Sequence, residues 1–243
     1  MRLDVYLVKE GYLPTRAKAQ QAIRAGKVKI NNIVSKKTGI NVTELDAVKV
    51  ANTNNFVGRG GEKLQYALEY FALNVEELAC LDVGASTGGF TQVLLQAGAR
   101  RVFAVDVGHG QLDVSLRNNP RIVNLEGVNF RYFDPEILWE SPKFACVDVS
   151  FISLKHILPK LAQCLVKPAK SVCLVKPQFE AGREFLNKQG VVKDPKIHQL
   201  AVKNVMEYAE NAGFVVNGIC ESPIFGGAGN KEFLMLLNYS RLT

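Results

Sequence analysis

The chain has 243 residues, of which 47% are hydrophobic and 22% are charged, and its formal net charge is +7. This composition supports a sizeable packed core and excludes a wholly disordered chain. No apolar run approaches the roughly 20 residues that span a bilayer, and the N-terminus lacks the pattern of a secretory signal. The five cysteines are scattered without a CxxC spacing, which argues against a disulfide framework or a zinc site. We therefore expect a cytoplasmic protein that binds no metal and no membrane.

The positive charge is concentrated at the N-terminus. Residues 1–50 hold ten Lys or Arg and four Asp or Glu, so six of the seven net positive charges lie in the first fifth of the chain. Because each phosphate that a cation neutralises releases condensed counterions, such a cluster indicates a polyanionic partner. A basic face that serves only solubility is the competing interpretation.

The first 50 residues predict a small α+β module. Leucines spaced i, i+4 predict a short helix that ends near Gly11. Thr15 is suited to cap a second helix, which ends at Gly26. An alternating stretch then reaches a turn at residues 31–32, and another extended stretch closes near Val50.

The strings RLD, RxxAxxxIxxGxV and VxIN in this module resemble the RNA-binding module first seen in ribosomal protein S-four. The resemblance implies that basic residues of the second helix and its surroundings face structured RNA. In this chain the matching residues are Arg2, Arg16, Lys18, Arg24, Lys27 and Lys29. The polar, Asn-rich residues 51–58 predict a linker, so we expect one domain over 1–50 and a second over 59–243.

From Gly58 onward, short β-branched runs alternate with helical patterns, which predicts an α/β fold: a mostly parallel sheet with helices on both faces. The expected strands are residues 79–83, 101–106, 122–125, 144–149, 171–175, 214–220 and 232–238. The clearest helices are expected over 61–73, 90–97, 154–165 and 197–212. Only a loop separates the last two strands, which predicts an antiparallel pair at the edge of the sheet. Ligands bind such sheets beyond the carboxyl ends of the strands.

The first of these strands leads into a glycine-rich turn, LDVGASTGGF. The turn lacks the GxGxxG spacing of dinucleotide-binding proteins and the Gly-Lys-Ser/Thr of a P-loop. The remaining D-x-G-x-x-x-G-G spacing is typical of S-adenosylmethionine-dependent methyltransferases, which have a Rossmann-like, seven-stranded class I fold. Asp106 ends the next strand, where an acid accepts the ribose hydroxyls of an adenosine. The residues expected to bind S-adenosylmethionine are Asp82, Gly84, Ala85, Ser86, Thr87, Gly88, Gly89, Phe90, Asp106 and Val107.

The sequence narrows the class of atom that accepts the methyl group, because it lacks the motifs that two classes of methyltransferase need. The fourth strand ends in VDVSF, without the Pro-Pro pair that accompanies methylation of adenine amino groups. Methylation of pyrimidine carbon 5 needs a cysteine nucleophile, whereas Cys146 and Cys173 fall inside apolar strand runs and are expected to be core residues. A hydroxyl acceptor is left, and it needs a base.

Four ionisable residues stand where such a site needs them. Lys63 opens the helix before the first strand of the sheet, Asp148 and Lys176 end the fourth and fifth strands, and Glu232 begins the last strand. We expect these four to be catalytic. The competing interpretation is two ion pairs that brace the sheet.

This constellation resembles the Lys-Asp-Lys-Glu tetrad of ribose 2′-O-methyltransferases of the FtsJ type. With the N-terminal module ahead of it, the whole chain resembles the TlyA family in the strings VGRGGEKL, VDVGHGQL, SLRNNPR, DVSFISL, LVKPQFE and GVVKDP. The resemblance implies methylation of a cytidine 2′-hydroxyl in ribosomal RNA. Because the chain resembles the shorter members of the family, we expect the 23S rRNA of the large ribosomal subunit as the substrate.

The resemblance also implies roles within the tetrad. Lys176 binds and deprotonates the ribose hydroxyl, Asp148 and Lys63 position and tune it, and Glu232 completes the hydrogen-bond network. Electrostatic steering of the hydroxyl by Lys176 is the alternative role. The alternative function is an RNA-binding or ribosome-assembly protein with a vestigial methyltransferase fold. The haemolysin label of this family finds no support in the sequence, which has neither a secretion signal nor a membrane-surface helix.

Overall fold

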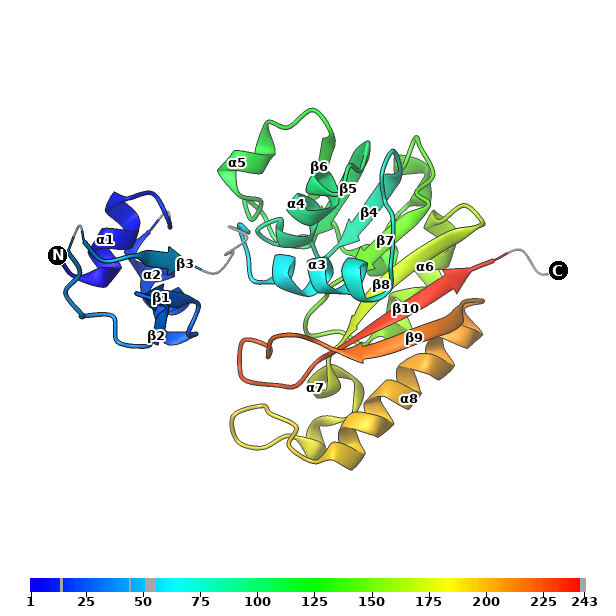
Figure 1. Cartoon of the computed structure of the whole chain (residues 1–243). Helices are drawn as coiled ribbons and strands as arrows, with labels where there is room; N and C mark the ends of the chain where they lie inside the picture. The colour runs from blue at the N-terminus through cyan, green and yellow to red at the C-terminus, as the bar shows by residue number, and fades with distance from the viewer. Residues whose placement is uncertain (14, 44, 51–55, 241–243) are drawn as a thin grey trace. The chain divides into compact units, whose positions relative to one another are not determined.

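The computed structural model describes residues 1–13, 15–43, 45–50 and 56–240, and it divides the chain into two compact units, Met1–Asn55 and Phe56–Thr243 (Figure 1). Of the linker expected over 51–58, residues 51–55 lie outside the described residues. Residues 56–58 belong to the second unit, where Phe56 is buried in the core.

The first unit is an α+β module, as the sequence predicts. Its elements are α1 (Leu3–Lys9), α2 (Arg16–Arg24), β1 (Val28–Ile30), β2 (Ile33–Ser35) and β3 (Val48–Val50). The strands form an antiparallel sheet in the order β2-β1-β3. Thr15 caps α2, because its side chain accepts a hydrogen bond from the backbone N–H of Lys18. Residues 31 and 32 both have positive φ, which suits the tight turn of the β1–β2 hairpin.

The second unit is built on a seven-stranded sheet in the order β6-β5-β4-β7-β8-β10-β9 (Figure 1). Its strands are β4 (Ala79–Val83), β5 (Arg101–Asp106), β6 (Ile122–Glu126), β7 (Phe144–Val147), β8 (Ala169–Val175), β9 (Val215–Glu221) and β10 (Phe233–Tyr239). The first five run parallel, and β10 pairs antiparallel with both β8 and β9. The expected antiparallel edge pair is therefore confirmed, with β9 at the edge.

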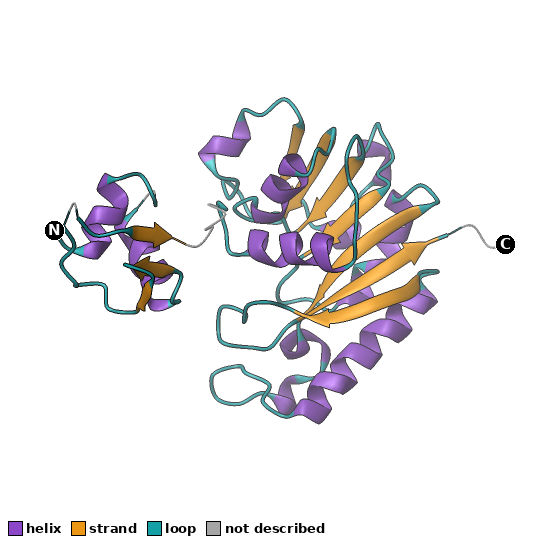
Figure 2. Cartoon of the chain, in the orientation of Figure 1, coloured by secondary structure: helices purple, strands orange, loops and turns teal. Residues whose placement is uncertain are grey.

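Helices cover both faces of this sheet (Figure 2). The α-helices are α3 (Gly60–Tyr70), α4 (Gly89–Gln96), α5 (Val114–Arg117), α6 (Leu158–Cys164), α7 (Pro177–Glu180) and α8 (Pro195–Asn211). Short 3₁₀ turns are η1 (Phe130–Tyr132), η2 (Pro135–Ile137), η3 (Leu154–His156) and η4 (Arg183–Phe185). The single helix expected over 154–165 is instead η3 followed by α6. Pro159 has no N–H to donate to an earlier carbonyl, so a continuous α-helix cannot pass through it.

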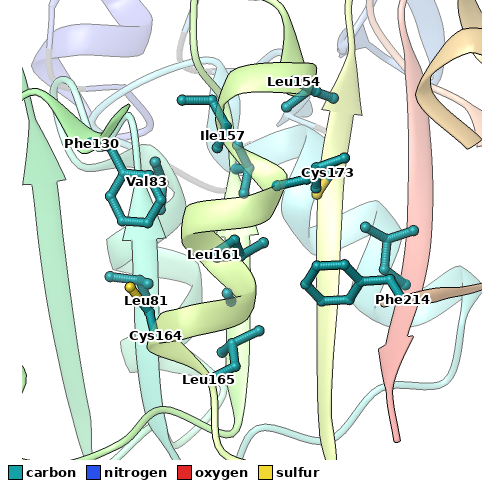
Figure 3. Packing of buried hydrophobic residues seen from close by; sticks show 14 of the residues in the cluster. Leu81, Val83, Phe130, Leu154, Ile157, Leu161, Cys164, Leu165, Cys173 and Phe214 are labelled. Atoms are coloured by element: carbon teal, nitrogen blue, oxygen red, sulfur yellow. The ribbon is translucent and has the colours of Figure 1, made fainter. Parts of the chain in front are cut away.

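Side chains alternate strictly between the two faces of the sheet, and a separate hydrophobic core lies on each face. Leu81 and Val83 of β4 belong to the cluster that contains α6 and α8, whereas Cys80 belongs to the cluster that contains α3 and α4. Successive side chains of a strand point to opposite faces, so each buried strand contributes to both cores. Figure 3 shows part of the first cluster, in which Leu161 of α6 lies between Leu81 of β4 and Cys173 of β8.

The topology brings three ionisable residues to one edge of the sheet. Asp148 follows β7 and Lys176 follows β8, so both stand at the carboxyl ends of parallel strands. Glu232 precedes β10, and because β10 runs antiparallel to β8, its beginning lies at the same edge. The register pairs Phe233 with Val175, which sets Glu232 beside Lys176 in sequence register.

Candidate active site

The glycine-rich turn that follows β4 needs glycine for geometric reasons. Gly84 has φ +85°, and a Cβ there would lie 2.5 Å from the backbone oxygen of Asp148. Gly88 has φ +90° and directly precedes α4. Side chains at these positions would be strained and would collide with the neighbouring segment. The turn therefore brings bare backbone to the carboxyl edge of the sheet.

A cavity of about 810 Å³ opens at this edge. Its wall comprises the glycine-rich turn, the start of α3, the segment after β7, the loop after β8 and the loop before β10. Six of the ten residues expected to bind the cofactor line it, namely Gly84, Ala85, Ser86, Thr87, Gly89 and Phe90. The volume suits a ligand of nucleoside size.

All four expected catalytic residues line this cavity and form two ion pairs. Lys63 Nζ donates to Glu232 Oε2 at 2.6 Å, with side chains 8% and 3% exposed. Lys176 Nζ lies 2.7 Å from Asp148 Oδ1, with side chains 9% and 19% exposed. The fold thus brings together residues that are up to 169 positions apart in the sequence. Buried charges require partners, and here each has one.

The hydrogen-bond donors and acceptors that these four residues leave unused determine which ligand they can hold. Lys176 Nζ also donates to Ser150 Oγ at 2.9 Å. An ammonium carries three N–H groups, so at least one remains for a ligand in the cavity. The Asp148 carboxylate is the most exposed of the four groups and can accept a proton from such a ligand. The arrangement can hold a hydroxyl and take up its proton.

Four residues expected to contact the cofactor do not line the cavity. Asp82 is fully buried behind the glycine-rich turn, where it accepts hydrogen bonds from Thr91 Oγ1 at 2.6 Å and Cys146 Sγ at 3.6 Å. Burial raises the pKa of Asp82 to about 7. Gly88 also faces away, since a Cβ there would collide with leucine side chains at 112 and 116. Both residues support the turn from inside the protein.

Asp106 ends β5 and Val107 follows it, and neither residue lines the cavity. The Asp106 carboxylate accepts hydrogen bonds from the backbone N–H of Ser86 at 2.8 Å and of Gly108 at 2.7 Å. Val107 is exposed. Asp106 therefore anchors the glycine-rich turn, and its carboxylate retains further acceptor capacity for a ligand.

The cysteines are core residues, as expected for Cys146 and Cys173. Both are fully buried, and burial raises the pKa of Cys173 to about 12 and that of Cys146 well above its usual value. The thiolate is the nucleophilic form, so neither residue supports covalent attack on a pyrimidine.

Sequence reasoning missed an aromatic residue at the cavity. Phe151 lines the cavity, is 91% exposed and has φ +62°, and its ring lies 5.3 Å from that of Phe179. Positive φ is uncommon for a bulky residue and costs about 1–3 kcal/mol, so such strain marks a functional candidate. The sequence gives no such signal, because a phenylalanine next to Ile152 reads as core.

In the first unit, two of the expected RNA-binding residues neutralise a buried acid. Arg2 Nε lies 3.1 Å and Arg16 Nε 2.9 Å from the carboxylate of Asp4, which is fully buried and also accepts from Gln20. The hydrogen bond from Arg2, helped by Gln20 and Arg16, holds the pKa of Asp4 well below its usual range. Arg24 and Lys29 are exposed, whereas Lys18 and Lys27 are half-buried. Asp4 therefore neutralises part of the positive charge that Arg2 and Arg16 would otherwise present on the expected basic face.

Within the part of the chain that the structure describes, no three His, Cys, Asp or Glu side chains are grouped so that they could hold a metal ion. None of the described helices is both long and apolar enough to cross a membrane.

Comparison with known proteins gives a consistent result. Residues 56–239 match the family described as FtsJ-like methyltransferase, and residues 1–48 match the S4 domain. The chain is 43% identical over 238 residues to the 16S/23S rRNA (cytidine-2′-O)-methyltransferase TlyA of Mycobacterium tuberculosis, covering 97% of this chain and 89% of that protein. It is 40% identical over 235 residues to Hemolysin A of Brachyspira hyodysenteriae, covering 96% and 98%. It is also 36% identical over 179 residues to the 23S rRNA (cytidine-2′-O)-methyltransferase TlyA of Campylobacter jejuni, covering 73% and 69%.

Solved structures agree with this assignment. A candidate hemolysin of Streptococcus thermophilus matches with a TM-score of 0.77 and 45% identity, over 99% of this chain and 88% of that one. A candidate S-adenosylmethionine-dependent methyltransferase of Listeria monocytogenes matches with a TM-score of 0.57 and 15% identity, over 76% of this chain and 100% of that one. The latter likeness confirms the expected methyltransferase fold alone.

Proposed function

Because the chain belongs to the FtsJ-like methyltransferase family and carries an S4 domain at its N-terminus, we propose that it methylates the ribose 2′-hydroxyl of cytidine in ribosomal RNA, with S-adenosylmethionine as methyl donor. The observation that carries this proposal is the gathering of two largely buried Lys–carboxylate pairs in one cavity, next to a glycine-rich turn. A protein that only binds RNA has no physical need to keep four ionisable groups largely buried at that edge.

The cavity fits S-adenosylmethionine. Gly84, Ala85 and Ser86 line the cavity with little or no side chain, so the backbone of the turn is open to a bulky ligand. In this proposal the turn holds the cofactor, and Asp106 accepts a hydrogen bond from its ribose while anchoring Ser86. When bound, S-adenosylmethionine supplies a methyl group on a positively charged sulfur, and the bonding electrons return to that sulfur as the methyl group leaves.

The Lys176–Asp148 pair prepares the acceptor. Lys176 donates its remaining N–H to the 2′-oxygen and so orients a lone pair toward the methyl carbon, while Ser150 and Asp148 fix the position of Nζ. As the new carbon–oxygen bond forms, the hydroxyl proton passes to the Asp148 carboxylate, because the Lys176 ammonium has no lone pair to accept it. The same ammonium stabilises the negative charge that develops on oxygen, so the pair both binds and activates the hydroxyl.

The Lys63–Glu232 pair holds the wall of the cavity. It joins the first turn of α3 to the start of β10, and a Cβ at Gly226 would lie 2.3 Å from Glu232 Oε1, so this glycine leaves room for the carboxylate. Its role in this proposal is to fix α3 and the loop before β10 against each other and to keep the charge of the tetrad balanced.

The large-subunit rRNA is the substrate that we propose. Both rRNA-modifying relatives described above carry 23S rRNA in their names, whereas 16S rRNA stands in one of them. The S4 domain supplies exposed cations such as Arg24 and Lys29 for the phosphate backbone. At the cavity, Phe151 offers an exposed ring on which an unstacked base can lie.

Replacing Lys176 tests this function. Lys176→Ala is expected to lower kcat for methyl transfer to large ribosomal subunits at least about 100-fold, while the dissociation constant for S-adenosylmethionine changes little. Lys203→Ala is the matched control, because Lys203 is an exposed lysine of α8. A Lys176→Ala enzyme with wild-type turnover would contradict the proposal. A wild-type protein that binds rRNA and cofactor without transferring methyl groups would favour the assembly protein with a vestigial fold.

A further inference from the structure

Two loops extend the cavity wall beyond the tetrad, and we call them the rim loops: residues 182–190 after α7 and residues 224–230 before β10. Both contribute cavity-lining residues, and Figure 1 shows the two loops on the same side of the second unit. The buried side chain of Asn230 joins them, since its Oδ1 accepts from Val192 N and its Nδ2 donates to Gly190 O, each at 3.0 Å. The rim loops therefore form one structural unit at the mouth of the cavity.

Each rim loop presents an exposed phenylalanine. Phe185 is 41% exposed and stands next to the cavity-lining Leu186; Phe225 is 64% exposed and precedes Gly226, which packs against Glu232. Among the residues that the structure describes, neither ring stacks on another aromatic ring or joins a hydrophobic core cluster. Leaving such rings in water forgoes the free energy of burial, so two of them on loops that border one cavity call for a partner.

The charge of the rim loops indicates the chemistry of that partner. Arg183 lines the cavity, is exposed and makes no ion pair within the described part of the chain. Lys188, in the same loop, is exposed as well. Aromatic rings interleaved with unpaired cations are the pattern by which proteins bind single-stranded nucleic acid: bases stack on the rings and phosphates meet the cations.

We propose that the rim loops bind the unpaired nucleotides that flank the target nucleotide, with bases stacked on Phe185 and Phe225 and a phosphate held by Arg183. This inference rests on the proposed function and deepens it. It names the substrate class at the site as single-stranded RNA, because paired bases are stacked within their helix and cannot present a face to either ring.

Binding of a short, fluorescently labelled single-stranded oligoribonucleotide of mixed sequence to the full chain tests this inference, with the same strand annealed to its complement for comparison. The wild-type protein is expected to prefer the single strand. Phe185→Ala and Phe225→Ala are each expected to weaken single-strand binding about tenfold and to leave duplex binding unchanged. Tryptophan at either position should preserve the affinity, whereas leucine, which keeps apolar area without a ring, should behave like alanine.

Tyr70→Ala is the matched control. Tyr70 is an aromatic residue with 57% exposure at the far end of α3, away from the cavity, and its loss should change neither affinity. Leucine variants that bind as well as the wild type, or alanine variants with unchanged single-strand affinity, would overturn the inference.

The KM for large ribosomal subunits separates this inference from the proposed function. We expect a similar rise in KM for both alanine variants, with kcat and cofactor affinity retained. An enzyme that methylates rRNA with unchanged KM in both variants would overturn the inference and leave the proposed function intact. A protein whose rim loops bind the single strand but that methylates no rRNA would support this inference and overturn the proposed function.

Discussion

The Lys63–Glu232 pair allows a sharp test of how the cavity is built. Both side chains are more than nine-tenths buried, with 2.6 Å between Nζ and Oε2. Lys63→Met or Glu232→Gln alone leaves the other group without its partner, and breaking a buried pair in this way costs about 3–5 kcal/mol. The Lys63→Met/Glu232→Gln double variant has no unpaired charge. We therefore expect it to unfold at a free energy within about 1–2 kcal/mol of the wild type, which gives a large coupling energy between the two sites.

Urea unfolding followed by tryptophan fluorescence measures these quantities. Trp139 is the one tryptophan of the chain, and its ring packs against the buried Phe103 in the second unit. Its signal therefore reports unfolding of the unit that contains the pair. The exposed Lys203–Glu207 pair on α8 is the control, for which a coupling energy of at most about 0.5 kcal/mol is expected.

Two results would refute this reasoning. Single variants that lose no more stability than the control variants would show that the pair is solvated in solution. A double variant that loses the sum of the two single losses would show that the two residues act independently. A double variant that is stable but transfers no methyl group would show that the pair acts in catalysis beyond fixing the wall of the cavity.

Three further predictions concern single side chains. Because burial raises the pKa of Asp82 to about 7 in the folded protein, the folded state binds more protons than the unfolded state between about pH 4 and 7, so its stability falls as pH rises. Asp82→Asn should therefore gain about 2–3 kcal/mol relative to the wild type between pH 5 and 8 in urea unfolding, and a pH-independent difference would contradict the burial argument. Phe151→Gly should relieve the strain of φ +62° and raise stability by about 1 kcal/mol, yet raise the KM for rRNA while cofactor binding stays constant; unchanged KM would remove the stacking role. The lowered pKa of Asp4 contributes stability that is present above about pH 4 and is lost as pH falls, so Asp4→Asn should speed hydrogen exchange of residues 1–50 at pH 7, and wild-type exchange would count against it.

Much of the fold follows from local patterns. The runs ACLDV and RVFAVD coincide with β4 and β5, because continuous β-branched and apolar runs suit strands buried on both faces. The ends of such strands meet at one edge, so Asp148 and Lys176 could be placed together from the sequence. Glu232 lies at the same edge because β10 runs antiparallel to β8, and the antiparallel pairing of the last two strands was predicted because only a loop separates them.

Other features depend on tertiary contacts that no local pattern encodes. Asp82 stands two residues before Gly84, yet its side chain faces Thr91 inside the protein, since the alternation of β4 directs it away from the cavity. Arg2 and Arg16 count as basic surface in a sequence, and only the packed module shows that they neutralise Asp4. The exposure of the Phe151 ring is set by a positive φ, which the sequence does not reveal in a non-glycine residue.

The chemical position of the transferred methyl group tests the central claim most directly. Large ribosomal subunits would be incubated with the protein and methyl-labelled S-adenosylmethionine, and the recovered rRNA would be digested with alkali, which cleaves a phosphodiester only beside a free 2′-hydroxyl. A cytidine 2′-O-methyl product is expected to retain the label in alkali-resistant dinucleotides that begin with cytidine. Label released in mononucleotides would place the methyl group on a base and contradict the assignment of the tetrad.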